Sequence, residues 1–203
     1  MTERAEFILA STSEGRAFVL RQAGLAFSQI AASVDECPLQ AEAMQEGSGI
    51  SASELAARLA EAKAVDVSKA HASAMVLGGD QVMECDGEIF QKAPTLEAAR
   101  EQLLALRGKT HRLHSALCVA KGGKPVWRHI SVAHMTMRAF SDAFLDDYCR
   151  TEGETMLHSV GGYRIEGLGI QLFSAIDGDH FTVMGLPLLP LLDYLRTNDW
   201  LTS

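Results

Sequence analysis

The hydrophobic pattern of this chain alternates between short continuous apolar runs and longer segments with apolar residues at helical spacing. Buried strands produce the first pattern and helices with one apolar face produce the second, so the alternation predicts an α/β fold. The predicted strands are 7–11, 25–30, 74–80 and two long strands within 111–140 that fold about a Gly-Gly-Lys turn. The predicted helices are 13–24, 51–70, 96–106, 141–150 and 186–197. We expect residues 35–49 to form an acidic, glycine-containing connection.

Asp80 follows a buried apolar run and two glycines, Gly78 and Gly79. We expect the strand to stop at these glycines, so that Asp80 projects from its carboxyl end, where open α/β sheets build ligand sites. A turn aspartate that closes a hairpin with Gly87 fits the position equally well, because glycine and aspartate are both common in turns. The pattern alone leaves both interpretations open.

The loop Ala10–Arg16 is rich in hydroxyl groups and joins a predicted strand to a predicted helix. Backbone N–H groups and the positive end of the helix dipole favour anion binding at such a junction. Ser11, Ser13 and Arg16 are therefore candidate phosphate ligands. In the alternative interpretation, Ser13 only caps the helix and Arg16 points into water.

Two lysines lie near this candidate chemistry. Lys63 is one turn beyond Leu59 and borders the apolar face of its predicted helix, and Lys92 follows an acidic hairpin. Each is either a phosphate-binding cation or an ordinary solvated lysine.

Composition excludes several function classes. The chain has 203 residues and a net charge of -8, which predicts one domain (1–203) and argues against sequence-independent nucleic-acid binding. The N-terminus lacks the apolar core of a signal peptide, and the most apolar segment is interrupted by prolines and too short to span a bilayer. We expect a cytoplasmic protein that binds neither nucleic acid nor membrane.

Cysteine and histidine spacing does not predict a zinc site. His111 and His114 are three residues apart on a predicted strand, which places their rings on opposite faces. The cysteines are far apart in sequence, and we expect them to be reduced and structural: Cys37, Cys85, Cys118 and Cys149.

Eight short motifs occur in an order and spacing that closely resemble the Maf family of nucleoside triphosphate pyrophosphatases. The motifs read ILASTS, VDE, AEAKA, GGDQV, DGEIFQK, LRGKTH, GGYRIEGLG and VMGLPL, and the resemblance runs from about Phe7 to Leu195. The variants GGDQV and IEGLGI are most similar to the subfamily associated with 7-methyl-GTP. They differ from the one associated with dTTP and UTP, which usually shows A-D-T and I-Q-G.

The resemblance implies a Maf/ITPase-like fold, with a mixed β-sheet flanked by helices and a central cleft between two lobes. It also implies hydrolysis of a nucleoside triphosphate to a monophosphate and pyrophosphate with Mg²⁺ or Mn²⁺, and a homodimer is plausible. The catalytic residues implied are Asp80, Glu36, Lys63 and Lys92. The substrate-binding residues implied are Ser11, Ser13, Arg16, Gln81 and Glu166. Asp80 and Glu36 are the expected metal ligands, because magnesium prefers one or two carboxylates together with phosphate oxygens.

The chain departs from the family pattern in the phosphate loop. Where the family reads S-P-R-R or S-P-W-R, this chain has Ser13, Glu14, Gly15 and Arg16, followed by Ala17. A carboxylate at Glu14 would repel a phosphate unless it points away. This departure favours the alternative of a catalytically weak or inactive nucleotide-binding protein linked to septum formation, whereas the retained acids and lysines favour an enzyme.

Glu166 lies where the pyrimidine-preferring relatives usually carry glutamine. A carboxylate accepts hydrogen bonds from the two adjacent donors of guanine, whereas uracil and thymine present an acceptor, a donor and an acceptor. We therefore expect a preference for 7-methyl-GTP or GTP. The alternative is a turn residue before Gly167 whose charge faces water.

Overall fold

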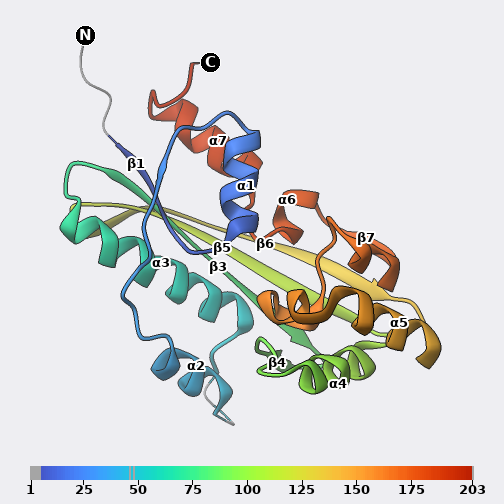
Figure 1. Ribbon diagram of the computed structural model, residues 1–203. Helices are drawn as coiled ribbons and strands as arrows, with labels where there is room; N and C mark the ends of the chain where they lie inside the picture. Colours follow the sequence, from blue (N-terminus) through green and yellow to red (C-terminus); the bar gives the residue numbers. More distant parts are fainter. Residues whose placement is uncertain (1–5, 46, 48, 203) are drawn as a thin grey trace. The chain divides into compact units, whose positions relative to one another are not determined.

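A seven-stranded mixed sheet forms the framework of the protein (Figure 1). The computed structural model describes residues 6–45, 47 and 49–202. The strands are β1 (Phe7–Ala10), β2 (Ser28–Gln29), β3 (Met75–Cys85), β4 (Glu88–Phe90), β5 (Thr110–Lys121), β6 (Lys124–Met137) and β7 (Phe173–Asp177). Their order is β2-β1-β3-β5-β6-β7, with β4 paired to β3. β1 pairs in parallel with β2 and β3, and β3–β4 and β6–β7 are antiparallel, so the predicted mixed sheet is confirmed.

Seven α-helices and three 3₁₀-helices accompany the sheet in the described residues. The α-helices are α1 (Glu14–Gln22), α2 (Cys37–Met44), α3 (Ala52–Ala70), α4 (Leu96–Leu106), α5 (Asp142–Glu152), α6 (His180–Val183) and α7 (Leu188–Thr197). The 3₁₀-helices are η1 (Gly153–His158), η2 (Val160–Gly162) and η3 (Leu168–Leu172). Each of the five predicted helices is present, and an α/β fold is confirmed.

The helix boundaries follow from local chemistry. The side chains of the four hydroxyl residues before α1, α3, α4 and α5 accept a hydrogen bond from a backbone N–H of the first turn, as N-cap residues do: Ser13, Ser51, Thr95 and Ser141. Gly24 and Gly108 adopt positive φ after α1 and α4, a conformation that glycine reaches without strain. The predicted hairpin between β5 and β6 turns at Gly122 and Gly123, which both have positive φ.

The described chain divides into two compact units. Unit 1 contains the described residues up to Gln81, Ser115–Ser131 and the described residues from His180 onward. Unit 2 contains Val82–His114 and Val132–Asp179. The three longest strands, β3, β5 and β6, each contribute residues to both units.

In unit 1, β1 is buried on both faces, which explains its continuous apolar sequence FILA. Phe7 and Leu9 belong to a hydrophobic cluster that includes residues of α1, β3, β5 and α7. Ile8 and Ala10 belong to a second cluster that includes Val67 of α3. The sheet of unit 1 is therefore covered by α1 and α7 on one face and by α3 on the other.

Two predicted strand boundaries are wrong, and one helix was not predicted. β3 does not stop at the glycines but continues for five residues beyond Asp80. The strand expected at 25–30 is limited to Ser28–Gln29. The connection expected at 35–49 contains α2, which begins with a proline at its first turn and buries a single residue, Ala43. A helix without a continuous apolar face gives little periodic signal, so α2 was missed.

In unit 2, α4, α5 and η1 contact one another. The rings of His111, Tyr163 and Phe173 also contact one another in this unit. The hydroxyl of Tyr148 donates to the carbonyl oxygen of Gly162 at 3.0 Å. The ring of His111 is fully buried, 5.6 Å from the ring of Tyr163 and 5.9 Å from that of Phe173. Nε2 of His111 and the Tyr163 hydroxyl are 2.6 Å apart and share a hydrogen bond.

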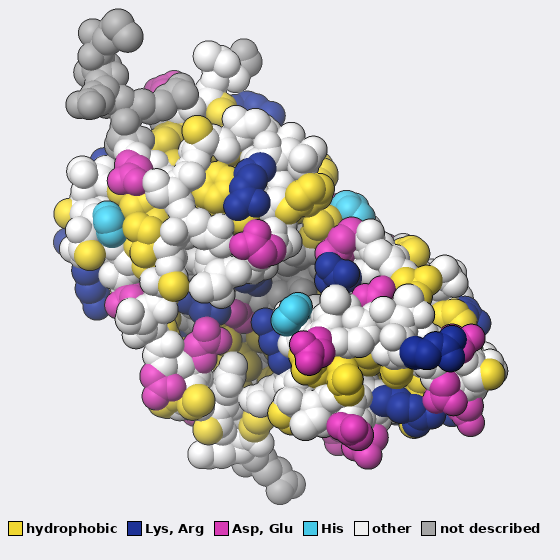
Figure 2. All heavy atoms as spheres, in the orientation of Figure 1, with side chains coloured by type: hydrophobic (Ala, Val, Ile, Leu, Met, Phe, Trp, Pro, Cys, Tyr) yellow, Lys and Arg dark blue, Asp and Glu magenta, His cyan; other side chains and the backbone are white. Residues whose placement is uncertain are grey.

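The surface carries charges of both signs. On the face drawn in Figure 2, acidic and basic side chains are interspersed with small groups of hydrophobic ones. In the described part of the chain, no helix is long and apolar enough to cross a membrane. All four cysteines are unpaired; Cys85 and Cys118 are buried, whereas Cys37 is exposed.

His111 should make the stability of the protein depend on pH. Burial lowers the pKa of His111 from 6.5 to about 4. The unfolded chain therefore binds a proton that the folded chain does not between these values, and the free energy of unfolding should fall as the pH falls from 6.5 towards 4. The loss should approach roughly 3 kcal/mol near pH 4. Urea denaturation at several pH values would measure it.

The matched variant is His111→Phe, which keeps an aromatic ring among Tyr163 and Phe173 but cannot be protonated. Its stability should change less between pH 6.5 and 4.5 than that of the native sequence, whatever its stability at pH 7. Equal pH dependence of the two proteins would show that His111 does not cause the effect.

Candidate active site

Strand β3 presents two different sets of residues on its two faces. Successive side chains of a strand point to opposite sides. Gly78 faces α3, because a Cβ atom added there would lie 2.2 Å from the carbonyl oxygen of Ala60. Gly79 faces the other side, where an added Cβ would lie 3.2 Å from Nε of Arg16. Asp80 continues on the α3 side.

The absence of a side chain at Gly78 allows α3 to pack directly on β3. An added Cβ would also lie 2.7 Å from the backbone nitrogen of Ala64, so any other residue would push the helix away. Ala60 and Ala64, the helix residues at this contact, are themselves small and fully buried. Lys63 lies between them in the sequence, so this close packing brings the start of its side chain next to β3.

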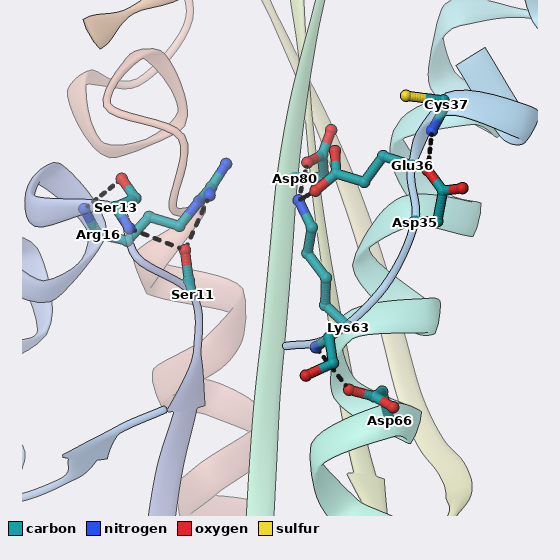
Figure 3. A network of polar contacts seen from close by, with 10 residues as sticks. Ser11, Ser13, Arg16, Asp35, Glu36, Cys37, Lys63, Asp66 and Asp80 are labelled. Carbon is teal, nitrogen blue, oxygen red and sulfur yellow. Dashed lines mark hydrogen bonds and ion pairs between the residues drawn. The ribbon is translucent and has the colours of Figure 1, made fainter. Parts of the chain in front are cut away.

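Lys63, Asp80 and Glu36 form a partly buried ionic cluster on the α3 side of β3 (Figure 3). Nζ of Lys63 is 2.6 Å from Oδ1 of Asp80 and 2.9 Å from Oε1 of Glu36. The side chains of Lys63 and Asp80 are 14% and 12% exposed, so water screens this pair weakly. One ammonium group thus joins two carboxylates that come from distant parts of the sequence.

Glu36 reaches the cluster from the N-cap position of α2. The turn before this helix is fixed by the carboxylate of Asp35, which accepts a hydrogen bond from the backbone N–H of Cys37 at 3.1 Å. The unpredicted helix α2 therefore has a clear role, because it anchors the chain segment that carries Glu36.

Burial raises the pKa of the Asp80 carboxyl above its usual value. Lys63 and Arg16 oppose this change by stabilising the charged form, and the nearby charge of Glu36 adds to it. A carboxylate whose pKa is raised is a better proton acceptor at neutral pH than an exposed one. Asp80 is therefore suited to act as a general base.

Arg16 lies at the start of α1 and is buried, contrary to the interpretation in which it points into water. Its Nε donates to the carbonyl oxygen of Gly185 at 2.8 Å, and its Nη1 donates to Oγ of Ser11 at 3.2 Å. Figure 3 shows its guanidinium group directed towards β3. Burial lowers its pKa, and Asp80 and Glu36 oppose that change, yet an arginine stays protonated.

Ser11 and Ser13 belong to the same loop as Arg16. Ser13 caps α1 by accepting from the backbone N–H of Arg16 at 3.3 Å, as the alternative interpretation expected. Oγ of Ser11 accepts from the backbone N–H of Ser13 as well as from Arg16. The two hydroxyl groups thus hold the loop together at the N-terminus of α1.

Gln81 lies on the face of β3 opposite Asp80 and contacts a segment distant in sequence. Its Nε2 donates to Oγ of Ser115 at 2.8 Å and to the carbonyl oxygens of Thr182 and Val183, both at 3.1 Å. Oγ of Ser115 also donates to the carbonyl oxygen of Thr182, at 2.7 Å.

Three residues with contacts at this site were not predicted from the sequence: Ser115, Thr182 and Gly185. The motif VMGLPL contains Gly185 and was available as a signal, but the motif does not reveal that a backbone carbonyl is the interacting group. Ser115 lies within an apolar strand and carries no motif of its own.

Unit 1 thus brings together seven of the predicted site residues: Ser11, Ser13, Arg16, Glu36, Lys63, Asp80 and Gln81. The other two, Lys92 and Glu166, belong to unit 2. Lys92 follows β4 and is exposed. Glu166 is exposed in the turn closed by the hydrogen bond from the Gly167 N–H to the Arg164 carbonyl oxygen.

The cluster also fits a divalent cation. The described residues contain no group of three or more histidine, cysteine, aspartate or glutamate side chains arranged to hold a metal. Asp80 and Glu36 are nevertheless two carboxylates that already share one cationic group, and magnesium is commonly held by one or two carboxylates plus substrate phosphates.

The sequence matches the family model described as Maf-like protein over residues 6–198. A relative named 7-methyl-GTP pyrophosphatase, from Brucella abortus biovar 1, is 48% identical over 94% of this chain and 95% of its own length. A relative named nucleoside triphosphate pyrophosphatase, from Granulibacter bethesdensis, is 46% identical over 97% of this chain and 99% of its own length. A solved structure of a HAM1 protein from Coxiella burnetii is 14% identical to this chain, and the similar region covers 68% of this chain and 75% of that one. Its TM-score of 0.43 is too low to support a conclusion.

Replacing Gly78 should separate α3 from β3. We expect Gly78→Ala to lower the free energy of unfolding by about 1–3 kcal/mol or more, because the new methyl group meets the helix backbone rather than a movable side chain. Gly15→Ala is the matched control, since an added Cβ there has no neighbour closer than 3.8 Å. Thermal or urea denaturation would compare the two. Equal stability of both variants would contradict the importance of this contact.

Proposed function

This chain belongs to the Maf family, and we propose that it is a nucleoside triphosphate pyrophosphatase. It would hydrolyse its substrate between the α- and β-phosphates, so that water and a nucleoside triphosphate give a nucleoside monophosphate and pyrophosphate. The observation that carries the proposal is the partly buried cluster of Lys63, Asp80 and Glu36 with the buried Arg16 nearby. The names of the curated relatives agree with it.

The phosphates would bind at the N-terminus of α1. The loop between β1 and α1 combines backbone N–H groups, two hydroxyl groups and a buried arginine, which together favour an anion. Arg16 makes two hydrogen bonds that fix the plane of its guanidinium group, so its Nη2 group is available as a donor to a phosphate oxygen.

Asp80 would accept a proton from the attacking water. Its raised pKa favours this role, and Lys63 at 2.6 Å stabilises the carboxylate before the water is deprotonated. Lys63 and Arg16 would then offset the charge that develops on the departing pyrophosphate. We also propose Lys92 as a cation that binds the phosphates.

Asp80 and Glu36 would hold a divalent cation, Mg²⁺ or Mn²⁺. Such an ion would supply further neutralisation of the phosphate charge. Lys63 contacts both carboxylates, so its ammonium group would have to shift or share them when the ion binds.

Glu14 does not argue against an active enzyme. Its side chain is 82% exposed and lies 3.7 Å from Nη1 of Arg21, which is on the same helix. A carboxylate that points into water and has a cation beside it repels a phosphate weakly. This placement weakens the alternative of an inactive nucleotide-binding protein.

Within this activity we propose 7-methyl-GTP or a GTP-like nucleotide as the substrate. Glu166 is exposed, so its carboxylate is available to accept hydrogen bonds from a base, and N7 methylation gives the ring a positive charge that a carboxylate favours. The turn position of Glu166 is equally compatible with a purely structural role, and the kinetic test below separates these roles.

Asp80→Asn should reduce turnover on the order of a thousandfold, because an amide cannot accept the proton of the attacking water. Affinity for a non-hydrolysable nucleoside triphosphate analogue should stay within roughly a few-fold, since the side-chain shape is kept. Pyrophosphate release with Mg²⁺ or Mn²⁺ and calorimetric titration of the analogue would measure the two effects.

The matched control is Asp66→Asn. Asp66 is an aspartate of α3, the helix that also carries Lys63, but it accepts from the backbone N–H of Ser33 and lies outside the cluster. Its replacement should leave turnover within about twofold of the native value, because it contacts no group of the proposed site. Near-normal turnover of Asp80→Asn would remove Asp80 from the mechanism.

Glu166→Gln should erode the preference for 7-methyl-GTP over dTTP on the order of tenfold, because an adjacent pair of donors loses one of its two acceptors. Steady-state kinetics on 7-methyl-GTP, GTP, UTP and dTTP would measure the change. Glu154→Gln, at another exposed glutamate of unit 2, should leave the ranking unchanged. If Glu166→Gln also keeps the native ranking, Glu166 is a turn residue without a role in base recognition.

A further inference from the structure

The segment Thr182–Gly185, at the end of α6, is held by side chains from three other parts of unit 1: Arg16 of α1, Gln81 of β3 and Ser115 of β5. Three of its four backbone carbonyl groups accept hydrogen bonds from such side chains. The carbonyl oxygens of Thr182 and Val183 accept from Gln81, and that of Gly185 accepts from Arg16. The segment therefore connects a residue of β3 to the arginine of the proposed phosphate site.

The backbone of this segment forms a tight turn. The N–H of Gly185 donates to the Thr182 carbonyl oxygen at 3.0 Å, and Gly185 has a φ of 81°, which favours glycine. A Cβ atom added at Gly185 would lie 3.4 Å from Nη2 of Arg16, so the turn also approaches the guanidinium group closely. A shift of Thr182 would therefore move the carbonyl group that binds Arg16.

Ser115 reinforces the contact from β5. It is fully buried, and it both receives a hydrogen bond from Gln81 and donates one to Thr182. Gln81, Ser115 and Thr182 thus form a closed polar triangle in which each member contacts the other two. Such a network is rigid when every polar group has a partner.

We propose that Gln81 and Ser115 are positioning residues that orient Arg16 through the Thr182–Gly185 segment. This inference rests on the proposed function of Arg16 and changes the role assigned to Gln81, from a substrate ligand to a support of one. Arg16 has two fixed contacts, Ser11 from its own loop and Gly185 from the segment. Removing the support of Gly185 would leave the guanidinium group held from one side.

Replacing Gln81 or Ser115 should misalign the guanidinium group of Arg16 without removing its charge. A displacement of about 1 Å in a positioning group can reduce catalysis on the order of a hundredfold. The competing role for Gln81 is direct contact with the substrate. Its Nε2 group donates to protein acceptors, but its Oε1 atom could accept a hydrogen bond from a substrate.

A double-mutant cycle separates the two roles. Gln81→Met keeps the length of the side chain and removes its donors, and we expect it to lower kcat/KM on the order of tenfold while Arg16 is present. In the Arg16→Ala background, the same change should lower kcat/KM by less than about twofold, because the group that Gln81 supports is gone. Ser115→Ala should show the same dependence on Arg16. Equal losses in both backgrounds would overturn the proposal and make Gln81 a substrate ligand.

A second measurement does not depend on turnover. In protein labelled with ¹⁵N-arginine, the Nε–H signal of Arg16, assigned by its absence from Arg16→Lys, should exchange slowly with solvent because it is buried and bonded to Gly185. Gln81→Met and Ser115→Ala should each accelerate that exchange on the order of tenfold or more. Unchanged exchange in both variants would overturn the proposal even in an active enzyme. Accelerated exchange without detectable hydrolysis would support the positioning contact and refute the proposed activity.

Ser68→Ala is the matched control for Ser115→Ala. Ser68 is an equally buried serine of unit 1 that donates to a backbone carbonyl oxygen, that of Val65. It makes no contact with the Thr182–Gly185 segment, so its replacement should leave the exchange rate of the Arg16 Nε–H unchanged. If Ser68→Ala accelerates exchange as much as Ser115→Ala, the effect is a general loss of stability, and the proposal fails. Should Gln81→Met not fold, Ser115→Ala carries both measurements.

Discussion

The close approach of α3 to β3 is the contact on which the proposed active site depends. Gly78 has no side chain, and the backbone of α3 occupies the space that a Cβ atom would need. Lys63 can therefore reach Asp80 with a short, well-shielded contact instead of extending into water. The same strand passes Arg16 on its other face at Gly79, where a side chain would again be crowded. Two adjacent glycines thus let two cations approach a single acidic residue from both sides of the sheet.

Partial burial strengthens the interactions between these charged groups and changes the pKa of Asp80. In an exposed site, the attraction between one lysine and two carboxylates would be weak and screened by salt. Within unit 1, desolvation raises the pKa of Asp80 while Lys63 and Arg16 counteract the change. The charge state of Asp80 therefore depends on the charges around it, and a phosphate or a metal ion that binds beside it would change its pKa.

The sequence predicted the fold class and the five main helices better than it predicted the local geometry. Capping residues such as Ser51 and Thr95 mark helix starts by a short-range mechanism, which a sequence pattern can express. The role of Gly78 depends on a helix that is far away in the sequence, so the pattern suggested a strand end where the strand continues. The contact between Arg16 and Gly185 spans 169 residues and uses a backbone carbonyl group, which carries no signal in the sequence.

Successive side chains of β3 point to opposite faces of the sheet, and this alternation fixes which residues of Gly78–Gln81 face each side. Gly78 and Asp80 face α3, whereas Gly79 and Gln81 face α1 and the Thr182–Gly185 segment. Inserting or deleting one residue upstream, within the part of β3 that pairs with β1, would exchange the two faces. The carboxylate would then point towards Arg16 and away from Lys63, and the amide would point towards α3 and away from the carbonyl oxygens of Thr182 and Val183. The length of the strand between the start of the β1 pairing and Asp80 is therefore fixed by the chemistry on both sides.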